Sequence, residues 1–199
     1  MPAPAQTSTA AIVAAGRHLL EERGLDALTM RDIADAVGVR APSLYKRVRG
    51  RSDLFRLILE DVADELTSAL DAAAGADDPV TDLRAMAVVY RRFAHSNPVA
   101  YALMYAPQAA PGATARSVPG APARAARSSS RFLGVVAELA GPRDALPAAR
   151  TIVAWANGFI AMELAGAFML GGDVQQAWDF GLDRVVAAVR SMSTAAEAG

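Results

Sequence analysis

The stretch 29-TMRDIADAVGVRAPSLYKRVRGRSDLF-55 determines the fold at the N-terminal end of this 199-residue chain. Thr29 is a residue type that caps helix N-termini and Gly38 is one that follows helix ends, so about two turns of helix are predicted between them. Pro42 suits the first turn of a second short helix, where its nitrogen needs no hydrogen bond. The inward face of the first helix is Met30, Ile33, Ala34 and Val37. The pattern predicts a helix-turn-helix.

Positive charge is concentrated directly after this turn. Residues 40–51 contain five basic side chains and no acidic one, whereas the whole chain has 20 Lys and Arg against 21 Asp and Glu. Residues 1–60 hold nine basic and seven acidic residues, and residues 61–199 hold 11 and 14. A local basic surface on a helix-turn-helix is typical of DNA binding, so a pI near 6.1 does not argue against it. The alternative is a basic helix face that is simply solvated.

The chemistry of DNA suggests roles for single residues. The second helix of a helix-turn-helix enters the major groove, while basic and hydroxyl side chains around it bind phosphates. Arg40 or Lys46 suits the acceptors of guanine, and small residues at the helix start let the backbone approach base edges. Tyr45, Arg49 and Arg51 suit phosphates. The predicted DNA-binding residues are Thr29, Arg31, Arg40, Ala41, Pro42, Ser43, Tyr45, Lys46, Arg47, Arg49 and Arg51.

Helical periodicity continues through the rest of the chain, and no convincing strand pattern of period two is present. The sequence therefore predicts an all-α protein of about nine helices. Prolines and glycines in 106–123 predict a long loop. The expected helices cover 8–23, 30–37, a short piece from Pro42, a longer one from Gly50 or Ser52 to about 71, 80–96, a short piece after Asn97-Pro98, 124–140, 144–170 and 173–193.

The quoted stretch, preceded by 21-EERGLDALT-29, resembles the DNA-binding domain of the tetracycline-repressor (TetR) family. The matching positions are Thr29, Ile33, Ala34, Gly38, Val39, Ser43, Leu44, Tyr45, Arg51 and Leu54. The resemblance implies a helix-turn-helix domain over 8–56 and a helical ligand-binding and dimerisation domain over 57–199. Arg40 departs from the family pattern, because a capping Ser is frequent there. The helix that follows is expected to lose a cap worth about 1 kcal/mol and to gain a DNA contact.

A second resemblance lies at 155-WANGFIAMELAGAFMLGGDVQQAWDFGLDRVV-186. It is similar to a TetR C-terminal subclass named for a Trp-His-Gly signature, with Asn157 in place of the His. The family's middle domain binds small molecules, and the apolar and aromatic residues of the central helices suggest a largely apolar ligand. Such residues are also ordinary core. Glu163 is either paired with Arg91 or Arg92, or binds a cationic or hydroxylated ligand. The ligand-binding candidates are Met86, Tyr90, Phe93, Tyr101, Met104, Tyr105, Phe132, Trp155, Phe159, Met162 and Glu163.

Two C-terminal helices carry stripes that suit a twofold four-helix bundle. Small residues on the first allow close approach, and larger apolar residues mark the second. The alternative is that both stripes are intramolecular core. The predicted dimerisation residues are Ala154, Gly158, Ala161, Ala165, Trp178, Leu182, Val185 and Val189.

The sequence argues against several other classes of protein. No cysteine is present, the two histidines lie apart from any carboxylate cluster, and no catalytic constellation is visible, so we expect neither a metal, a cofactor nor an enzyme. No secretory signal is recognised, and Glu163 and Asn157 oppose a membrane span over 151–170, so a cytoplasmic protein is expected. The leading hypothesis is a homodimeric repressor released from its DNA operator by a small ligand. A constitutive DNA-binding or architectural helical protein without an effector is the alternative.

Overall fold

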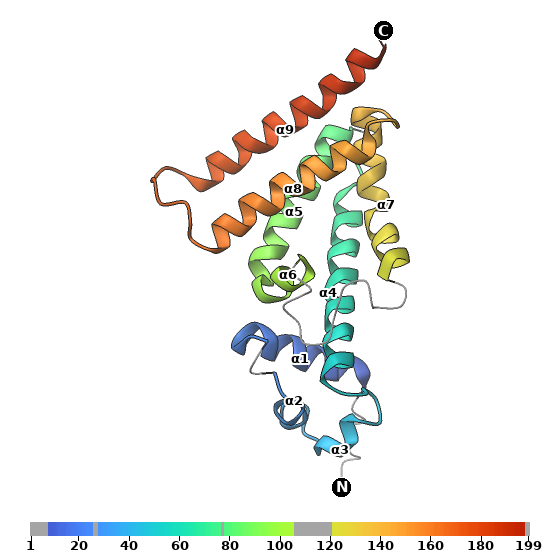
Figure 1. Ribbon diagram of the computed structural model, residues 1–199, viewed down its shortest axis with the longest axis vertical. Helices are drawn as coiled ribbons and strands as arrows, with labels where there is room; N and C mark the ends of the chain where they lie inside the picture. The colour runs from blue at the N-terminus through green and yellow to red at the C-terminus, as the bar shows by residue number, and fades with distance from the viewer. Residues whose placement is uncertain (1–7, 26–27, 77, 106–120, 198–199) are drawn as a thin grey trace. The chain divides into compact units, whose positions relative to one another are not determined.

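The computed structural model describes residues 8–25, 28–76, 78–105 and 121–197, and in these ranges it contains nine helices and no strand. The prediction of an all-α protein is therefore confirmed. The helices are α1 (Thr9–Arg23), α2 (Met30–Ala36), α3 (Ala41–Leu44), α4 (Arg51–Ala73), α5 (Pro79–Ser96), α6 (Pro98–Tyr105), α7 (Ala121–Ala140), α8 (Ala145–Leu164) and α9 (Val174–Glu197), as labelled in Figure 1.

The ends of the last helices differ from the predicted ones. Helix α8 ends at Leu164 rather than at 170, because Gly166 adopts a left-handed φ of 64° and the N–H of Ala167 turns back to the Met162 carbonyl. This is the hydrogen-bonded helix end that glycine favours. Helix α7 begins at Ala121, inside the loop predicted over 106–123. The remainder of that loop, 106–120, lies outside the described residues.

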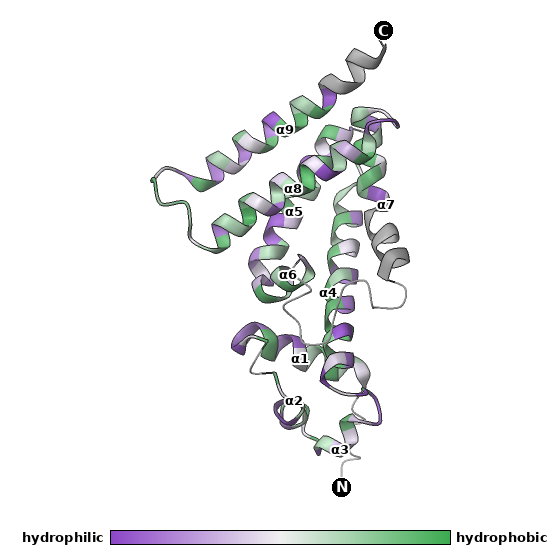
Figure 2. Cartoon of the chain, in the orientation of Figure 1, coloured by the Kyte–Doolittle hydropathy of each residue, from purple (hydrophilic) through white to green (hydrophobic). Residues whose placement is uncertain are grey.

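The chain divides into two compact units. The first contains α1, α2, α3, the part of α4 up to Glu65, α6 and the first three residues of α7. The second contains the rest of α4 and of α7, with α5, α8 and α9. This division differs from the predicted boundary at residue 57, which falls inside the continuous helix α4. The helix shows apolar and polar residues on different sides in Figure 2, as expected of a helix with one face in a core.

The core of the first unit is made by the inward faces of α1, α2, α3 and α4. Gly16 permits the close packing of α1 on α4, because a Cβ atom there would lie 2.8 Å from the Cδ1 of Ile58. The largest fully buried side chains of this unit are Ile12, Leu20, Leu28, Ile33, Leu44, Val48, Leu54, Ile58 and Val62.

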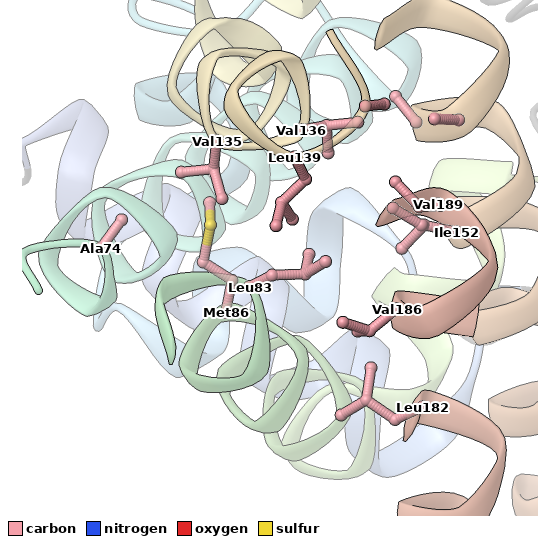
Figure 3. Packing of buried hydrophobic residues seen from close by; sticks show 13 residues of the cluster. Ala74, Leu83, Met86, Val135, Val136, Leu139, Ile152, Leu182, Val186 and Val189 are labelled. Atoms are coloured by element: carbon pink, nitrogen blue, oxygen red, sulfur yellow. The ribbon is translucent and has the colours of Figure 1, made fainter. Parts of the chain in front are cut away.

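The core of the second unit joins four helices and the end of α4. Side chains from α5, α7, α8 and α9 meet in one apolar cluster, shown in Figure 3: Ala74, Leu83, Met86, Val135, Val136, Leu139, Ile152, Leu182, Val186 and Val189. Asp82 is buried at its edge and accepts hydrogen bonds from the backbone N–H groups of Gly75 (3.0 Å) and Ala76 (2.8 Å), which fixes the α4–α5 turn. In the part of the chain that the structure describes, no helix is both long enough and apolar enough to cross a membrane.

Candidate nucleic-acid interface

The turn between α2 and α3 is built as a helix-turn-helix requires. Thr29 caps α2, because its hydroxyl accepts the N–H of Asp32 at 3.1 Å. Gly38 follows α2 with a φ of 71°, a conformation that favours glycine. The N–H of Val39 then bonds the Ala34 carbonyl at 2.9 Å, which closes the turn. The predicted cap at Thr29 and the predicted helix end at Gly38 are both confirmed.

Helix α3 and the turn after it are anchored by two apolar residues that leave the basic ones outside. Leu44 and Val48 are 0% and 1% exposed, so the segment is fixed against the core of the first unit. Tyr45, which follows Leu44 directly, is 55% exposed. Of the predicted DNA-binding residues, these are exposed: Thr29, Arg31, Arg40, Pro42, Ser43, Tyr45, Lys46, Arg47 and Arg49. Ala41 and Arg51 are half-buried.

Arg51 has a contact within the protein that the sequence did not reveal. Its Nη2 donates to the backbone carbonyl of Leu25, which ties the start of α4 to the turn after α1. Arg49, the other arginine predicted to contact phosphate next to this turn, has an exposed side chain. Asp53, in the first turn of α4, accepts the backbone N–H of Arg49 at 2.9 Å. This hydrogen bond, followed by that of the Arg56 side chain, holds the pKa of Asp53 below its ordinary value of 3.8.

Helix α3 begins without a side-chain cap. Arg40 occupies the N-cap position with an extended backbone (φ −80°, ψ 143°), and its side chain makes no capping hydrogen bond. The expectation that Arg40 loses this cap is confirmed. The first turn of α3 therefore has no side-chain acceptor from its N-cap residue, and an exposed arginine stands at that position.

The predicted ligand-binding residues fall into several groups. Tyr101, Met104 and Tyr105 are on α6, in the first unit, where the two tyrosine rings lie 5.2 Å apart. Met86 and Phe132 belong to the apolar core cluster of the second unit, or pack against it. Phe93 is 6% exposed, whereas Met162 is 48% exposed. The remaining four candidates, Tyr90, Trp155, Phe159 and Glu163, lie in the second unit.

Helices α5, α8 and α9 of the second unit share a polar and aromatic cluster. Arg91 donates from Nε to one oxygen of Glu163 at 2.9 Å and from Nη2 to the other at 2.5 Å. Its third nitrogen, Nη1, donates to the side-chain oxygen of Gln175 at 2.6 Å. The guanidinium carbon lies 5.0 Å from the ring centre of Trp178 and 6.0 Å from that of Phe159. The predicted pairing of Glu163 with Arg91 is confirmed.

Glu163 has a second basic partner. Nε2 of His95 lies 3.0 Å from the carboxylate, and the side chain of Glu163 is 15% exposed. The hydrogen bond from Arg91 lowers the pKa of the Glu163 carboxyl the most, and the hydrogen bond from His95 lowers it further. Together they hold this pKa below its ordinary value of 4.5. Glu163 is therefore ionised at neutral pH, and its charge is compensated inside the chain.

Two contacts in this cluster had no clear signal in the sequence. Tyr90 donates from its hydroxyl to the side-chain oxygen of Asn157 at 2.9 Å, so Asn157 joins α8 to α5. Gly181 lies against Trp155, and a Cβ atom there would be 2.5 Å from the ring atom Cζ2. Hydrophobic periodicity cannot find either contact, because each depends on which residue of another helix lies opposite.

The predicted dimerisation residues divide by helix. On α8, Ala154, Gly158 and Ala161 are exposed in the single chain, as is Ala165, which caps the C-terminal end of that helix. On α9, Trp178, Leu182 and Val189 are 1%, 4% and 2% exposed, and Val185 packs against the same core. These α9 side chains are covered, wholly or in part, by their own chain, as the alternative of an intramolecular core describes. Its exposed side carries Phe180, which is 67% exposed.

Comparisons with known proteins agree with this geometry. The family model "Bacterial regulatory proteins, tetR family" matches residues 12–58, and the model "Tetracyclin repressor-like, C-terminal domain" matches residues 83–185. An uncharacterised HTH-type transcriptional regulator of Mycobacterium tuberculosis is 35% identical over 101 residues, which are 49% of this chain and 45% of that protein. The chain thus spans about half the length of the curated relatives that it matches.

Solved structures with the same fold cover nearly the whole chain. A protein of unknown function from Rhodococcus sp. RHA1 has a TM-score of 0.76 and 26% identity, over 90% of this chain and 94% of that one. A TetR variant from Acinetobacter baumannii AYE in complex with minocycline has a TM-score of 0.63 and 23% identity, over 92% and 96%. The model of the C-terminal domain, over residues 83–185, alone spans more than half of the sequence. The chain therefore belongs to the TetR family of bacterial regulatory proteins.

Proposed function

We propose that the chain is a DNA-binding transcriptional regulator that recognises its operator with α3 and the basic turn after it. The observation that carries this proposal is the surface around α3, where Leu44 and Val48 are buried while the basic residues of 40–49 are exposed. No acidic residue interrupts this surface between 40 and 51. A solvated helix face needs no helix-turn-helix beneath it, whereas this arrangement is one that places its second helix in the major groove of DNA.

The residues around α3 differ in what they offer to DNA. Exposed Arg47 and Arg49 and the hydroxyl of Tyr45 suit phosphates, which contribute affinity at any sequence. Pro42 and Ser43 stand at the start of α3, where a helix in the major groove comes nearest to the bases. Arg40 lies beside them, and the two acceptors of guanine fit its guanidinium. We therefore assign sequence preference to Arg40 and Ser43, and affinity to the others.

We propose further that two copies act together as a repressor that a small ligand releases. The exposed small residues of α8, with exposed Met162 on the same helix, offer an apolar surface to a second copy, and α9 carries exposed Phe180. A dimer would place two helix-turn-helix units on two half-sites. A small molecule is supported by the fold, since the Acinetobacter structure contains minocycline. Compensation of Glu163 within the chain favours a largely apolar ligand over a cationic one.

The test is binding of the full-length protein to DNA from upstream of its own gene. Fluorescence anisotropy at several salt concentrations is expected to show selective binding that weakens steeply with salt. Arg49→Gln should weaken binding to all sequences and reduce the salt slope by about 0.9 for each phosphate that the protein no longer neutralises. Arg40→Gln should instead reduce the preference for the operator over unrelated DNA.

The control for these variants is Arg84→Gln, which removes a half-exposed arginine from α5 in the second unit. It is expected to leave operator binding and its salt slope unchanged. Absence of any sequence-selective binding by the parent protein would contradict the proposal. Selective binding that no small molecule weakens would favour a constitutive DNA-binding protein instead.

A further inference from the structure

Arg17 on α1 contacts two other segments of the first unit at once. Its Nη1 pairs with Glu65 and lies 3.3 Å from the carboxylate of Asp61, both on α4. Its Nη2 donates to the side-chain oxygen of Asn97 at 2.6 Å. The Arg17 side chain is 20% exposed, and Asn97 is 7% exposed. Two nitrogens of one planar guanidinium thus fix α4 and the start of α6 to α1, and the rigid geometry of the group limits their independent movement.

Glu21, one turn further along α1, completes the attachment of α6. Its carboxylate accepts the backbone N–H groups of Val99 at 3.0 Å and Ala100 at 2.9 Å, in the first turn of that helix. A carboxylate at a helix N-terminus satisfies N–H groups that have no partner in the helix. Asn97 immediately precedes α6. Glu21 caps this helix, and the side-chain oxygen of Asn97 accepts a hydrogen bond from Arg17 instead.

The residues that Arg17 contacts lie where the chain passes between the two units. The chain leaves the first unit after Glu65, returns to it at Asn97, and leaves it again after Ala123. Arg17 contacts Glu65 at the first of these three crossings and Asn97 at the second. A displacement that is transmitted from the second unit along α4 reaches Glu65, and one transmitted through the end of α5 reaches Asn97. Both of these residues contact Arg17.

We propose that Arg17 is a positioning residue that couples the second unit to the helix-turn-helix, with Glu21 supporting it. This inference rests on the proposed function, because coupling requires DNA at one end. Helix α1 packs on α2 and, at Gly16, on Ile58 of α4, so a shift of α1 is passed to the helices that carry the DNA surface. Coupling is reciprocal in free energy: if the state of the second unit changes operator affinity, operator binding shifts the second unit between its states by the same factor.

This reciprocity permits a test with DNA as the only ligand. The chain has two tryptophans, Trp155 and Trp178, and both lie in the aromatic cluster of the second unit, 4.8 Å apart between ring centres. Their emission reports on the second unit while the anisotropy of labelled operator reports on the first. In one titration of the full-length protein, both signals are expected to change with the same midpoint.

Arg17→Gln is expected to keep operator binding within about threefold of the parent, since the residue lies outside the DNA surface, and to lose at least about half of the tryptophan change. Asn97→Ala and Glu65→Gln each remove one partner of Arg17, and each should reduce the tryptophan change by a smaller amount. They serve as the test if Arg17→Gln does not fold. Arg23→Gln removes another arginine of α1, half-exposed and 3.9 Å from Asp32, and should retain the full tryptophan change.

The outcomes separate the inference from the proposed function. Absence of selective operator binding by the parent contradicts the proposed function. Operator binding with no tryptophan change in the parent, or with an equal change in the parent, Arg17→Gln, Asn97→Ala and Glu65→Gln, overturns the inference while leaving the proposed function intact. A reduced tryptophan change in the Arg17, Asn97 and Glu65 variants but not in Arg23→Gln supports it.

Discussion

Single residues set how closely the helices of the second unit approach one another. At Gly181 the backbone of α9 lies against the indole of Trp155, which in turn lies 4.8 Å from the ring of Trp178. Gly181 is needed here for space and not for backbone freedom, because its φ is not in the left-handed region. Because Gly181 has no Cβ atom, the Trp155 ring of α8 can lie directly against the backbone of α9.

We expect Gly181→Ala to lower the free energy of unfolding by about 1–3 kcal/mol, because the new methyl group must displace a large, partly buried ring. Urea unfolding followed by circular dichroism measures it. Gly134→Ala is the matched control, since α7 leaves open space at that position and alanine there should raise stability by about 0.5–1 kcal/mol. Equal effects of the two substitutions would contradict the close packing described for Gly181.

Glu163 makes the stability of the second unit depend on acid pH. Arg91 first, and then His95, lowers the pKa of its carboxyl in the folded chain below 4.5. A carboxyl whose folded pKa is lowered contributes stability that is complete above its ordinary pKa and is lost as the pH falls through the folded value. Stability should therefore decrease below pH 4.5, and Glu163→Gln should reduce that decrease while destabilising the protein at pH 7.

Urea unfolding of both proteins at pH 7 and at several values below 4.5 measures this difference. Glu138→Gln, at an exposed position of α7, is the control and should follow the parent. If Glu163→Gln lost as much stability on acidification as the parent, the ion pair with Arg91 would not be the cause.

At the scale of elements, α3 is a short helix with few stabilising interactions of its own. It spans Ala41–Leu44, its N-cap residue makes no side-chain hydrogen bond, and Leu44 is its one buried residue. So short a helix depends on packing rather than on its own hydrogen bonds. The exposed Arg40 at the N-cap therefore lowers the stability of α3 relative to a capping residue. A contact with DNA would explain why an arginine stands there.

We expect Arg40→Ser to stabilise the protein by about 0.5–1 kcal/mol, because the hydroxyl can accept an N–H in the first turn of α3. Thermal unfolding of the full chain measures this. Arg40→Ala separates the cap from the removal of charge and should give no such gain. Equal stabilities of the serine and alanine variants would show that the N-terminus of α3 is already satisfied in another way.

At the scale of the whole molecule, one prediction concerns the number of copies. The small residues of α8 stay exposed in the single chain, whereas the apolar stripe of α9 is covered. A second copy that covers α8 would bring two helix-turn-helix units together, and binding of one half-site would then raise the effective concentration of the other.

We expect Ala161→Glu to convert a dimer into a monomer, because it places a charge in the middle of the exposed stripe. Light scattering coupled to size-exclusion chromatography measures the mass, and operator affinity should fall as the dimer dissociates. Ala72→Glu places the same charge on an exposed position of α4 and should leave the mass unchanged. A parent protein that is monomeric at micromolar concentration would contradict the prediction.

The helices and the exposed basic surface around α3 were largely predictable, because both are local. Thr29, Gly38 and Pro42 act on their own neighbours, so the helix-turn-helix could be predicted from residue types. The α8 end was predicted too far along, since 165–170 remains apolar and only the left-handed Gly166 interrupts it. Apolar periodicity also led to the prediction that the α9 stripe contacts a second copy. Periodicity cannot decide this, because an apolar stripe looks the same whether its own chain or another covers it.

The sequence by itself determined the all-α fold, the helix-turn-helix and the basic surface around α3, because helix caps, helix periodicity and charge are properties of neighbouring residues. The tertiary structure decided the partners of single side chains. It placed Arg51 on the Leu25 carbonyl, Glu163 between Arg91 and His95, and Arg17 between Glu65 and Asn97. These pairs join residues up to 80 positions apart, and their contacts exist only after distant helices have packed.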